Sequence, residues 1–112
     1  ITETGKATVT VLTFPGDVGG ILPNINRWAG QIGLNPTNLE DLPKFTSSYI
    51  IAEHSGLFVR LEGEEQSILG GILSFHGFTW FFKMQGDSAT VMAQEVNWRQ
   101  FLDSIKMIDH AH

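Results

Sequence analysis

Alternating polar and apolar residues predict that the chain begins with a strand over residues 6–14. Val9 and Val11 alternate with threonines, and most side chains in this stretch are β-branched, which is typical of strands. Pro15 and Gly16 end the strand, because both residue types favour turns.

A helical pattern follows over residues 20–32. Its apolar positions are spaced by 4, 3 and 4 residues and therefore lie on one face: Ile21, Ile25, Trp28 and Ile32. Pro23 is compatible with the first helical turn, and Gly33 suits the position just after the helix end. Gly30 costs about 1 kcal/mol relative to alanine in a helix interior. We expect it to allow another element to pack closely.

Residues 35–44 are predicted to form a connector. A single helical turn is expected from Leu39 to Leu42, with Asn38 as its cap and Pro43 as its end.

The pattern then becomes that of antiparallel strands. We expect them over residues 49–53, 57–62, 68–75 and 78–84. Ser55-Gly56 and His76-Gly77 are predicted two-residue turns, and Gly70-Gly71 marks a predicted bulge within a strand. Asp87 or Ser88 is expected to cap a second long helix, which runs to about Met107.

This order of elements predicts an α+β fold. We expect residues 1–112 to form a single domain, in which two long helices pack on a mostly antiparallel sheet of about five strands. Trp80 and Phe81 point to opposite faces of their strand, so both faces of the sheet need cover. That cover could come from helices, from residues missing at the N-terminus or from a partner.

Charge and composition narrow the classes of function. The chain has 7 Lys and Arg against 12 Asp and Glu, and the net charge of −5 argues against nucleic-acid binding, which needs a basic surface. The absence of cysteine excludes disulfides, thiolate metal sites and cysteine nucleophiles. No apolar run approaches the roughly 20 residues of a membrane helix. Because the sequence begins at Ile1, we expect any targeting signal to lie upstream.

The glycine-rich stretch from Gly16 to Gly20 is the first candidate site. Free N–H groups at a helix start can bind an anion. However, the stretch lacks a phosphate-loop motif, and Asp17 would repel a phosphate. A tight turn that needs positive φ is the interpretation we favour.

Five polar residues are the candidate ligand-binding set: Asn24, Asn26, Arg27, Gln31 and Lys83. Asn24, Arg27 and Gln31 are predicted to form a polar stripe that faces outward from the first helix, where Arg27 could hold a carboxylate with two hydrogen bonds. Lys83 could hold an anion over an aromatic floor made by its strand. Alternatively, Arg27 tethers a loop or pairs with an acidic side chain, the asparagines cap local backbone, and the aromatic strand is sheet core.

Neither a metal site nor a catalytic site is predicted. The four histidines lie in separate turns and at the C-terminal end, without the spacing of a converging ligand set. A nucleophile elbow of the GxSxG type is absent.

Several segments resemble an uncharacterised domain family of exported proteins and lipoproteins in planctomycete-type bacteria. They are Phe-Pro-Gly-Asp-Val-Gly-Gly at residues 14–20, Asn-Ile-Asn-Arg-Trp at 24–28, Gly-Gln-Ile-Gly-Leu at 30–34 and Thr-Trp-Phe-Phe-Lys-Met at 79–84. The resemblance implies an exported location and a fold similar to Mog1/PsbP-like α/β/α sandwiches. It carries no established activity. Family members often have a further N-terminal segment before the first strand, which we expect to be missing here.

We therefore predict a non-enzymatic binding or interaction module of an exported or envelope-associated protein. The expected partner is a second copy of the chain or another protein, with no cofactor, no nucleic acid and no direct membrane insertion. The alternative is an enzyme that binds a small molecule or an anion through the polar stripe of the first helix.

Overall fold

A computed structural model describes residues 6–16 and 20–106. In these residues one antiparallel sheet has the strand order β1-β5-β4-β3-β2. Its strands are β1 (Ala7–Pro15), β2 (Thr46–Ile51), β3 (His54–Glu62), β4 (Gln66–Phe75) and β5 (Phe78–Asp87). The prediction of an α+β fold with an antiparallel sheet of five strands is confirmed.

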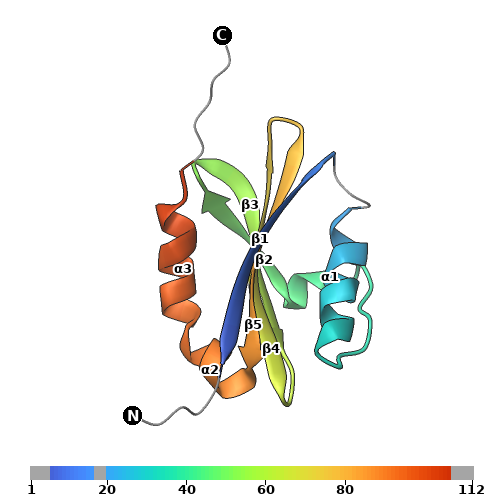
Figure 1. The fold of residues 1–112 in the computed structure, drawn as a ribbon. Helices are drawn as coiled ribbons and strands as arrows, with labels where there is room; N and C mark the ends of the chain where they lie inside the picture. The colour runs from blue at the N-terminus through green and yellow to red at the C-terminus, as the bar shows by residue number, and fades with distance from the viewer. Residues whose placement is uncertain (1–5, 17–19, 107–112) are drawn as a thin grey trace.

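Helices lie on both faces of the sheet. Figure 1 shows the sheet nearly edge-on, with α1 (Ile21–Gln31) on one side and α3 (Glu95–Ser104) on the other. The short helix α2 (Ser88–Ala93) precedes α3, and a 3-10 turn, η1 (Leu42–Lys44), precedes β2. None of the helices in the described part of the chain is long and apolar enough to span a membrane.

The prediction of a second long helix is wrong. Gln94 interrupts it with φ −96° and ψ 9°, outside the α-helical region, and so closes α2 and opens α3. Its N–H donates to the Val91 carbonyl, and its own carbonyl accepts from the Trp98 N–H at 2.7 Å. The apolar residues Val91, Trp98 and Leu102 are nevertheless all buried against the sheet.

Each face of the sheet carries its own core. On the α1 face the buried cluster consists of Ile25, Trp28, Val59, Leu61, Ile68, Ile72 and Phe81. On the α3 face it consists of Ile51, Phe58, Leu69, Leu73, Phe82, Val91, Trp98 and Leu102. The central strand β4 is buried on both faces from Ser67 to Leu73, because a helix covers it on each side.

The predicted bulge at Gly70-Gly71 is wrong, because the pairing of β4 with both neighbours runs through these glycines without a break. The two residues instead make room for the helices on opposite faces. A Cβ on Gly70 would lie 2.6 Å from Cζ3 of Trp28, and one on Gly71 would lie 2.8 Å from Cδ2 of Leu102. Glycine here permits close packing of α1 and α3 on the sheet.

One of the two predicted hairpin turns is confirmed. His76 and Gly77 join β4 to β5 with φ of 52° and 81°, as a primed turn requires. The turn predicted at Ser55-Gly56 is wrong. Ile51 pairs with His54, so the turn consists of Ala52 and Glu53, whose φ values are 54° and 68°. Gly56 lies inside β3, where a Cβ would be 2.8 Å from the Ile72 carbonyl oxygen.

The cap predicted in the connector is present. The Asn38 side chain accepts a hydrogen bond from the Asp41 N–H at 2.8 Å. The prediction that Pro43 ends the turn is wrong, because Pro43 lies within η1, at an early helical position where no N–H is needed.

A cluster of charges holds α3 on the β2–β3 side of the sheet. Glu95 accepts hydrogen bonds from Arg60 at 3.0 Å and from Arg99 at 3.2 Å. Burial acts to raise the pKa of Glu95, but the two arginines outweigh burial, so that pKa lies below its ordinary value. The Arg99 guanidinium also lies 4.0 Å from the ring centroid of Phe58.

The prediction that Gly33 ends α1 is confirmed. It has a φ of 79°, and the N–H groups of Gly33 and Leu34 donate to the carbonyls of Gly30 and Ala29, which is a Schellman motif. The expectation for Gly30 is wrong, because no described atom other than those of its chain neighbours and of the α1 backbone lies within 4 Å of a Cβ placed there.

Gly30→Ala is therefore expected to stabilise the domain by up to about 1 kcal/mol, since alanine restricts the unfolded chain and favours the helix. Chemical denaturation followed by circular dichroism measures this gain. Gly33→Ala is the control and is expected to destabilise, because its positive φ strains any residue with a Cβ. A loss of stability in Gly30→Ala would contradict the absence of a close neighbour.

Candidate functional site

A cleft lies between helix α1 and the sheet, at the edge that strand β1 forms. The cleft has a volume of about 230 Å³, and we call it the cationic cleft; its lining is Thr10, Leu12, Phe14, Arg27, Trp28, Gln31, Phe81 and Lys83. The strand register produces it, because Thr10 pairs with Lys83 and Leu12 with Phe81, so that β1 and β5 present these side chains on the α1 face. Trp28 occupies the space above Gly70 and thereby forms the inner wall.

Two basic side chains meet in the cationic cleft. The Arg27 Nη1 donates to the Asn24 Oδ1 at 2.6 Å, and the Lys83 Nζ donates to the Gln31 Oε1 at 2.8 Å. The Lys83 Nζ also lies 5.7 Å from the ring centroid of Trp28. Burial lowers the pKa of Lys83, and the nearby positive charge of Arg27 lowers that pKa further. Among residues 6–16 and 20–106, no carboxylate forms an ion pair with Arg27 or Lys83.

The structure brings together three of the five predicted ligand-binding residues, namely Arg27, Gln31 and Lys83. The prediction that Asn24 faces outward is wrong, since it is only 2% exposed. Its Nδ2 donates to the Gly20 carbonyl at 2.6 Å while its Oδ1 holds Arg27, so it fixes the guanidinium beside the start of α1.

Asn26 lies away from the cationic cleft and holds the connector instead. Its Oδ1 accepts from the Thr37 N–H at 2.7 Å, and its Nδ2 donates to the Thr37 carbonyl at 3.1 Å. Capping of local backbone was the alternative to ligand binding for the asparagines, and Asn26 has that role. Ligand binding by the remaining three residues stays a prediction.

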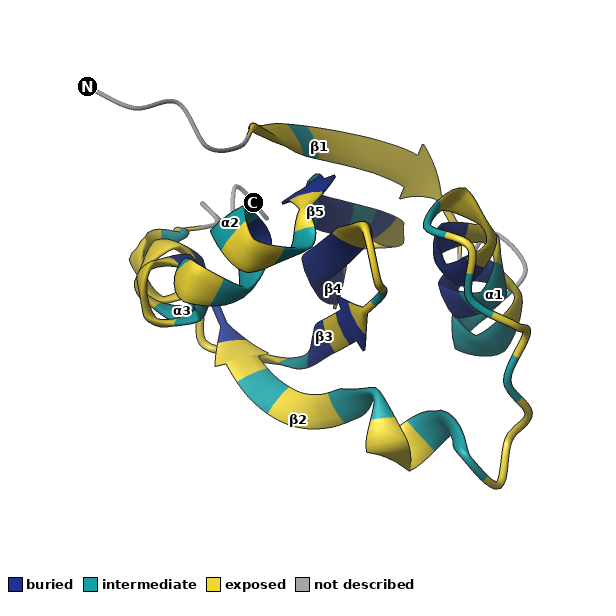
Figure 2. Ribbon diagram, turned by 90° about the horizontal axis from the view of Figure 1, so that it is seen from below, coloured by how far each residue is buried: buried dark blue, intermediate teal, exposed yellow. Residues whose placement is uncertain are grey.

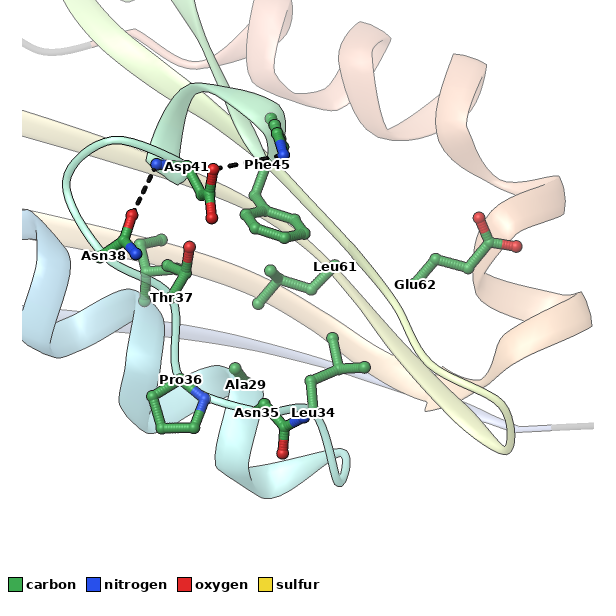
Figure 3. A pocket seen from close by; sticks show the side chains of 12 residues that line it. Ala29, Leu34, Asn35, Pro36, Thr37, Asn38, Asp41, Phe45, Leu61 and Glu62 are labelled. Atoms are coloured by element: carbon green, nitrogen blue, oxygen red, sulfur yellow. Dashed lines mark hydrogen bonds and ion pairs between the residues drawn. The ribbon is translucent and has the colours of Figure 1, made fainter.

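A second concavity lies on the opposite flank of α1, beneath the connector, and sequence reasoning missed it. We call it the connector pocket; it has a volume of about 330 Å³. In Figure 3 the side chains of Leu34, Phe45 and Leu61 gather around the space, with Asn38 and Asp41 on the connector side. The two hydrogen bonds between Asn26 and Thr37 hold the connector above this space. Apolar residues in the connector were the available signal, but their partners on β3 were not predictable.

The charged groups at the rim of the connector pocket already have partners. Asp41 pairs with Lys44 at 3.2 Å, and Glu62 pairs with Arg60 at 3.2 Å. The rest of the lining combines apolar side chains with uncharged polar ones, so the connector pocket offers hydrophobic contact without an unpaired charge. The two concavities therefore differ in the ligand chemistry that they favour.

The glycine-rich stretch serves as a turn where the structure describes it. Gly16 and Gly20 have φ of 75° and 92°, as predicted, while residues 17–19 lie outside the described residues. The Gly16 N–H donates to the Gly77 carbonyl at 2.8 Å, and the Thr79 hydroxyl donates to the Gly16 carbonyl. Gly16 therefore has no free N–H to offer an anion.

The histidines that the structure describes contact an aromatic ring. His76 stacks on Phe75 with ring centroids 4.1 Å apart, and His54 meets the same ring edge-on at 4.9 Å. Within the described ranges, no group of three or more His, Asp and Glu side chains could hold a metal ion. His110 and His112 lie outside those ranges.

Taken with the fold, these features define an α+β domain with a five-stranded antiparallel sheet between helices and a cationic cleft at one edge. No protein-family profile and no curated protein matches the sequence. Among solved structures, the chain is similar to PA94 from Pseudomonas aeruginosa, which is described as a protein of unknown function and a candidate regulator. The TM-score is 0.51 with 12% identity, over 96% of this chain and 87% of that one. At this identity the likeness shows the fold alone.

Proposed function

We propose that the chain is a non-enzymatic interaction module that pairs with a second copy of itself along the edge strand β1. The observation that carries the proposal is the open edge of β1. All of its nine residues except Thr10 are exposed, although the strand is rich in apolar side chains. Val9, Val11 and Leu12 are 50%, 45% and 48% exposed.

Apart from Pro15 at its end, strand β1 carries none of the usual devices that protect a sheet edge within the described residues. Figure 2 shows it as an exposed strip at the margin of the sheet, beyond the helices on either face. No charged residue lies between Ala7 and Pro15, and the pairing with β5 has no bulge. Long, regular and apolar edges of this kind present unpaired backbone groups to any other strand. The opposite edge, β2, is shorter and begins with the polar sequence Thr46-Ser47-Ser48.

A second copy fits this edge because the strand is complementary to itself. In an antiparallel arrangement centred on Val11, that residue meets its own copy, while Val9 meets Thr13. No like charges would be opposed along the strand, so each copy would add backbone hydrogen bonds and cover the apolar side chains of the other. Mutual pairing would convert two sheets into one of ten strands.

The test is the oligomeric state of the purified chain. Light scattering coupled to gel filtration should give about twice the monomer mass of 12.4 kDa. The double variant Val9→Lys/Val11→Lys should return the mass to that of the monomer, because lysines on facing strands repel each other and disfavour edge pairing.

The matched control is Ser48→Lys/Ile50→Lys on the other edge strand. These residues are also exposed, two apart and on one face of β2, and the control should remain a dimer. A wild-type chain that is monomeric at all concentrations would overturn the proposal. A control variant that also becomes monomeric would assign the contact to another surface.

We further propose, from the family resemblance alone, a Mog1/PsbP-like relationship and an exported or envelope-associated location. Cell fractionation with an antibody against the domain tests the location. Finding the protein only in the cytoplasmic fraction would argue against the export that the resemblance implies.

A further inference from the structure

We propose that the cationic cleft binds a small carboxylic acid whose apolar body lies against β1. This inference does not depend on pairing along the edge. Its basis is the combination of two cations and an aromatic corner within one concavity of a protein whose net charge is −5.

The electrostatics of the cleft favour an anion. Arg27 and Lys83 face the same space from α1 and β5, and no described carboxylate pairs with either. The repulsion between them and the burial of Lys83 make two adjacent positive charges unfavourable when the cleft holds only solvent. A bound anion would relieve the repulsion and replace the hydration that Lys83 loses.

The hydrogen-bonding geometry suits a carboxylate. Asn24 holds Arg27 through Nη1 alone, and Asn24 is itself fixed by the Gly20 carbonyl, so the guanidinium is oriented before any ligand arrives. The other guanidinium donors can form the two parallel hydrogen bonds that a planar carboxylate accepts. Lys83 uses one of its three donors on Gln31 and can supply a further charged hydrogen bond.

The apolar lining indicates that the ligand carries more than charge. Trp28 and Phe14 each meet the ring of Phe81 edge-on, with centroids 6.1 and 6.0 Å away, which forms a preformed aromatic corner. Leu12 lies beside this corner and is 48% exposed, so the apolar part of a ligand would bury some of its side chain. The volume of about 230 Å³ lies below the roughly 300 Å³ at which pockets for drug-sized ligands begin. The apolar part of the ligand is therefore expected to be a single ring or a short aliphatic chain.

The test uses benzoate as the probe, added to the isotopically labelled chain and followed by two-dimensional NMR. Saturable shifts are expected for residues of the cationic cleft, including the Trp28 indole N–H. Benzamide, which has the same shape without the charge, and inorganic phosphate, which has charge without an apolar body, should each bind at least about tenfold more weakly.

Two variants probe the cations, and a third is the control. Arg27→Gln and Lys83→Met should each weaken benzoate binding by about tenfold or more, since each removes a charged hydrogen bond. Lys44→Met removes an equivalent charge from a side chain that is 72% exposed at the connector pocket, and it should leave binding unchanged. If Lys83→Met fails to fold, Arg27→Gln decides the question, because Arg27 is exposed.

Several results would overturn the assignment. One is no saturable benzoate binding to the folded wild-type chain, and another is unchanged binding in Arg27→Gln. If phosphate bound as tightly as benzoate, the apolar lining would not contribute to binding. If benzamide bound as tightly as benzoate, the two positive charges would not contribute. The Val9→Lys/Val11→Lys variant alters the other face of β1, so it should still bind benzoate whatever its oligomeric state.

Discussion

Leu102→Ala is expected to lower the free energy of unfolding by about 2–5 kcal/mol, the range for a fully buried leucine. Leu102 has no exposed surface, and it packs from α3 onto Gly71 of the central strand. Removal of its side chain would leave a cavity between the helix and the sheet. Urea denaturation followed by circular dichroism measures the loss.

Val96→Ala is the matched control for this experiment, because Val96 lies on the same helix but is 68% exposed. It should change the stability by no more than about 0.5 kcal/mol. If Leu102→Ala and Val96→Ala cost the same, α3 does not pack on the sheet as described.

Gly71→Ala is expected to cost about 1–3 kcal/mol, because the new methyl group overpacks a filled core. It would lie 2.8 Å from Cδ2 of Leu102 and 3.3 Å from Cδ1 of Ile51, both on buried side chains. The same denaturation experiment measures the cost, with Gly30→Ala as the glycine substitution that has space around it.

The two substitutions should also be coupled. In the Leu102→Ala background, the methyl group of Gly71→Ala enters the cavity instead of meeting a side chain. The double variant should therefore lose less stability than the two single losses added, with a coupling of about 0.5–3 kcal/mol. Strict additivity would show that the two residues are not in contact.

Local patterns in the sequence predicted those elements whose signals are local. The spacing of apolar residues located α1, because a helix on a sheet buries one stripe. His76-Gly77 located a hairpin, since that turn needs two positive φ values. Ala52-Glu53 makes the same kind of turn without a glycine, because the pairing of Ile51 with His54 imposes it. Sequence reasoning therefore assigned the turn to the nearby Gly56, which has a different role.

The candidate site was predictable only in part. The polar stripe indicated Arg27 and Gln31, and the aromatic strand indicated Lys83. Whether these side chains meet depends on how α1 lies across the sheet, which no local pattern encodes. The contributions of Thr10, Leu12 and Phe14 depend on the register of β1 against β5. Asn24 resembles its outward-facing neighbours in sequence, and only its packed environment shows that it holds Arg27.

The strand order has a consequence for how the sheet assembles. Strands β2 to β5 form a meander of neighbours in the chain, whereas β1 joins it by pairing Val11 with Phe82, 71 positions away. Closing so long a loop costs more chain entropy than closing a hairpin, and it slows folding. The meander can therefore form before β1 docks, and an incomplete sheet would expose Phe82 and its neighbours on β5. The strand with the open edge is thus also the one whose attachment depends most on the rest of the domain being in place.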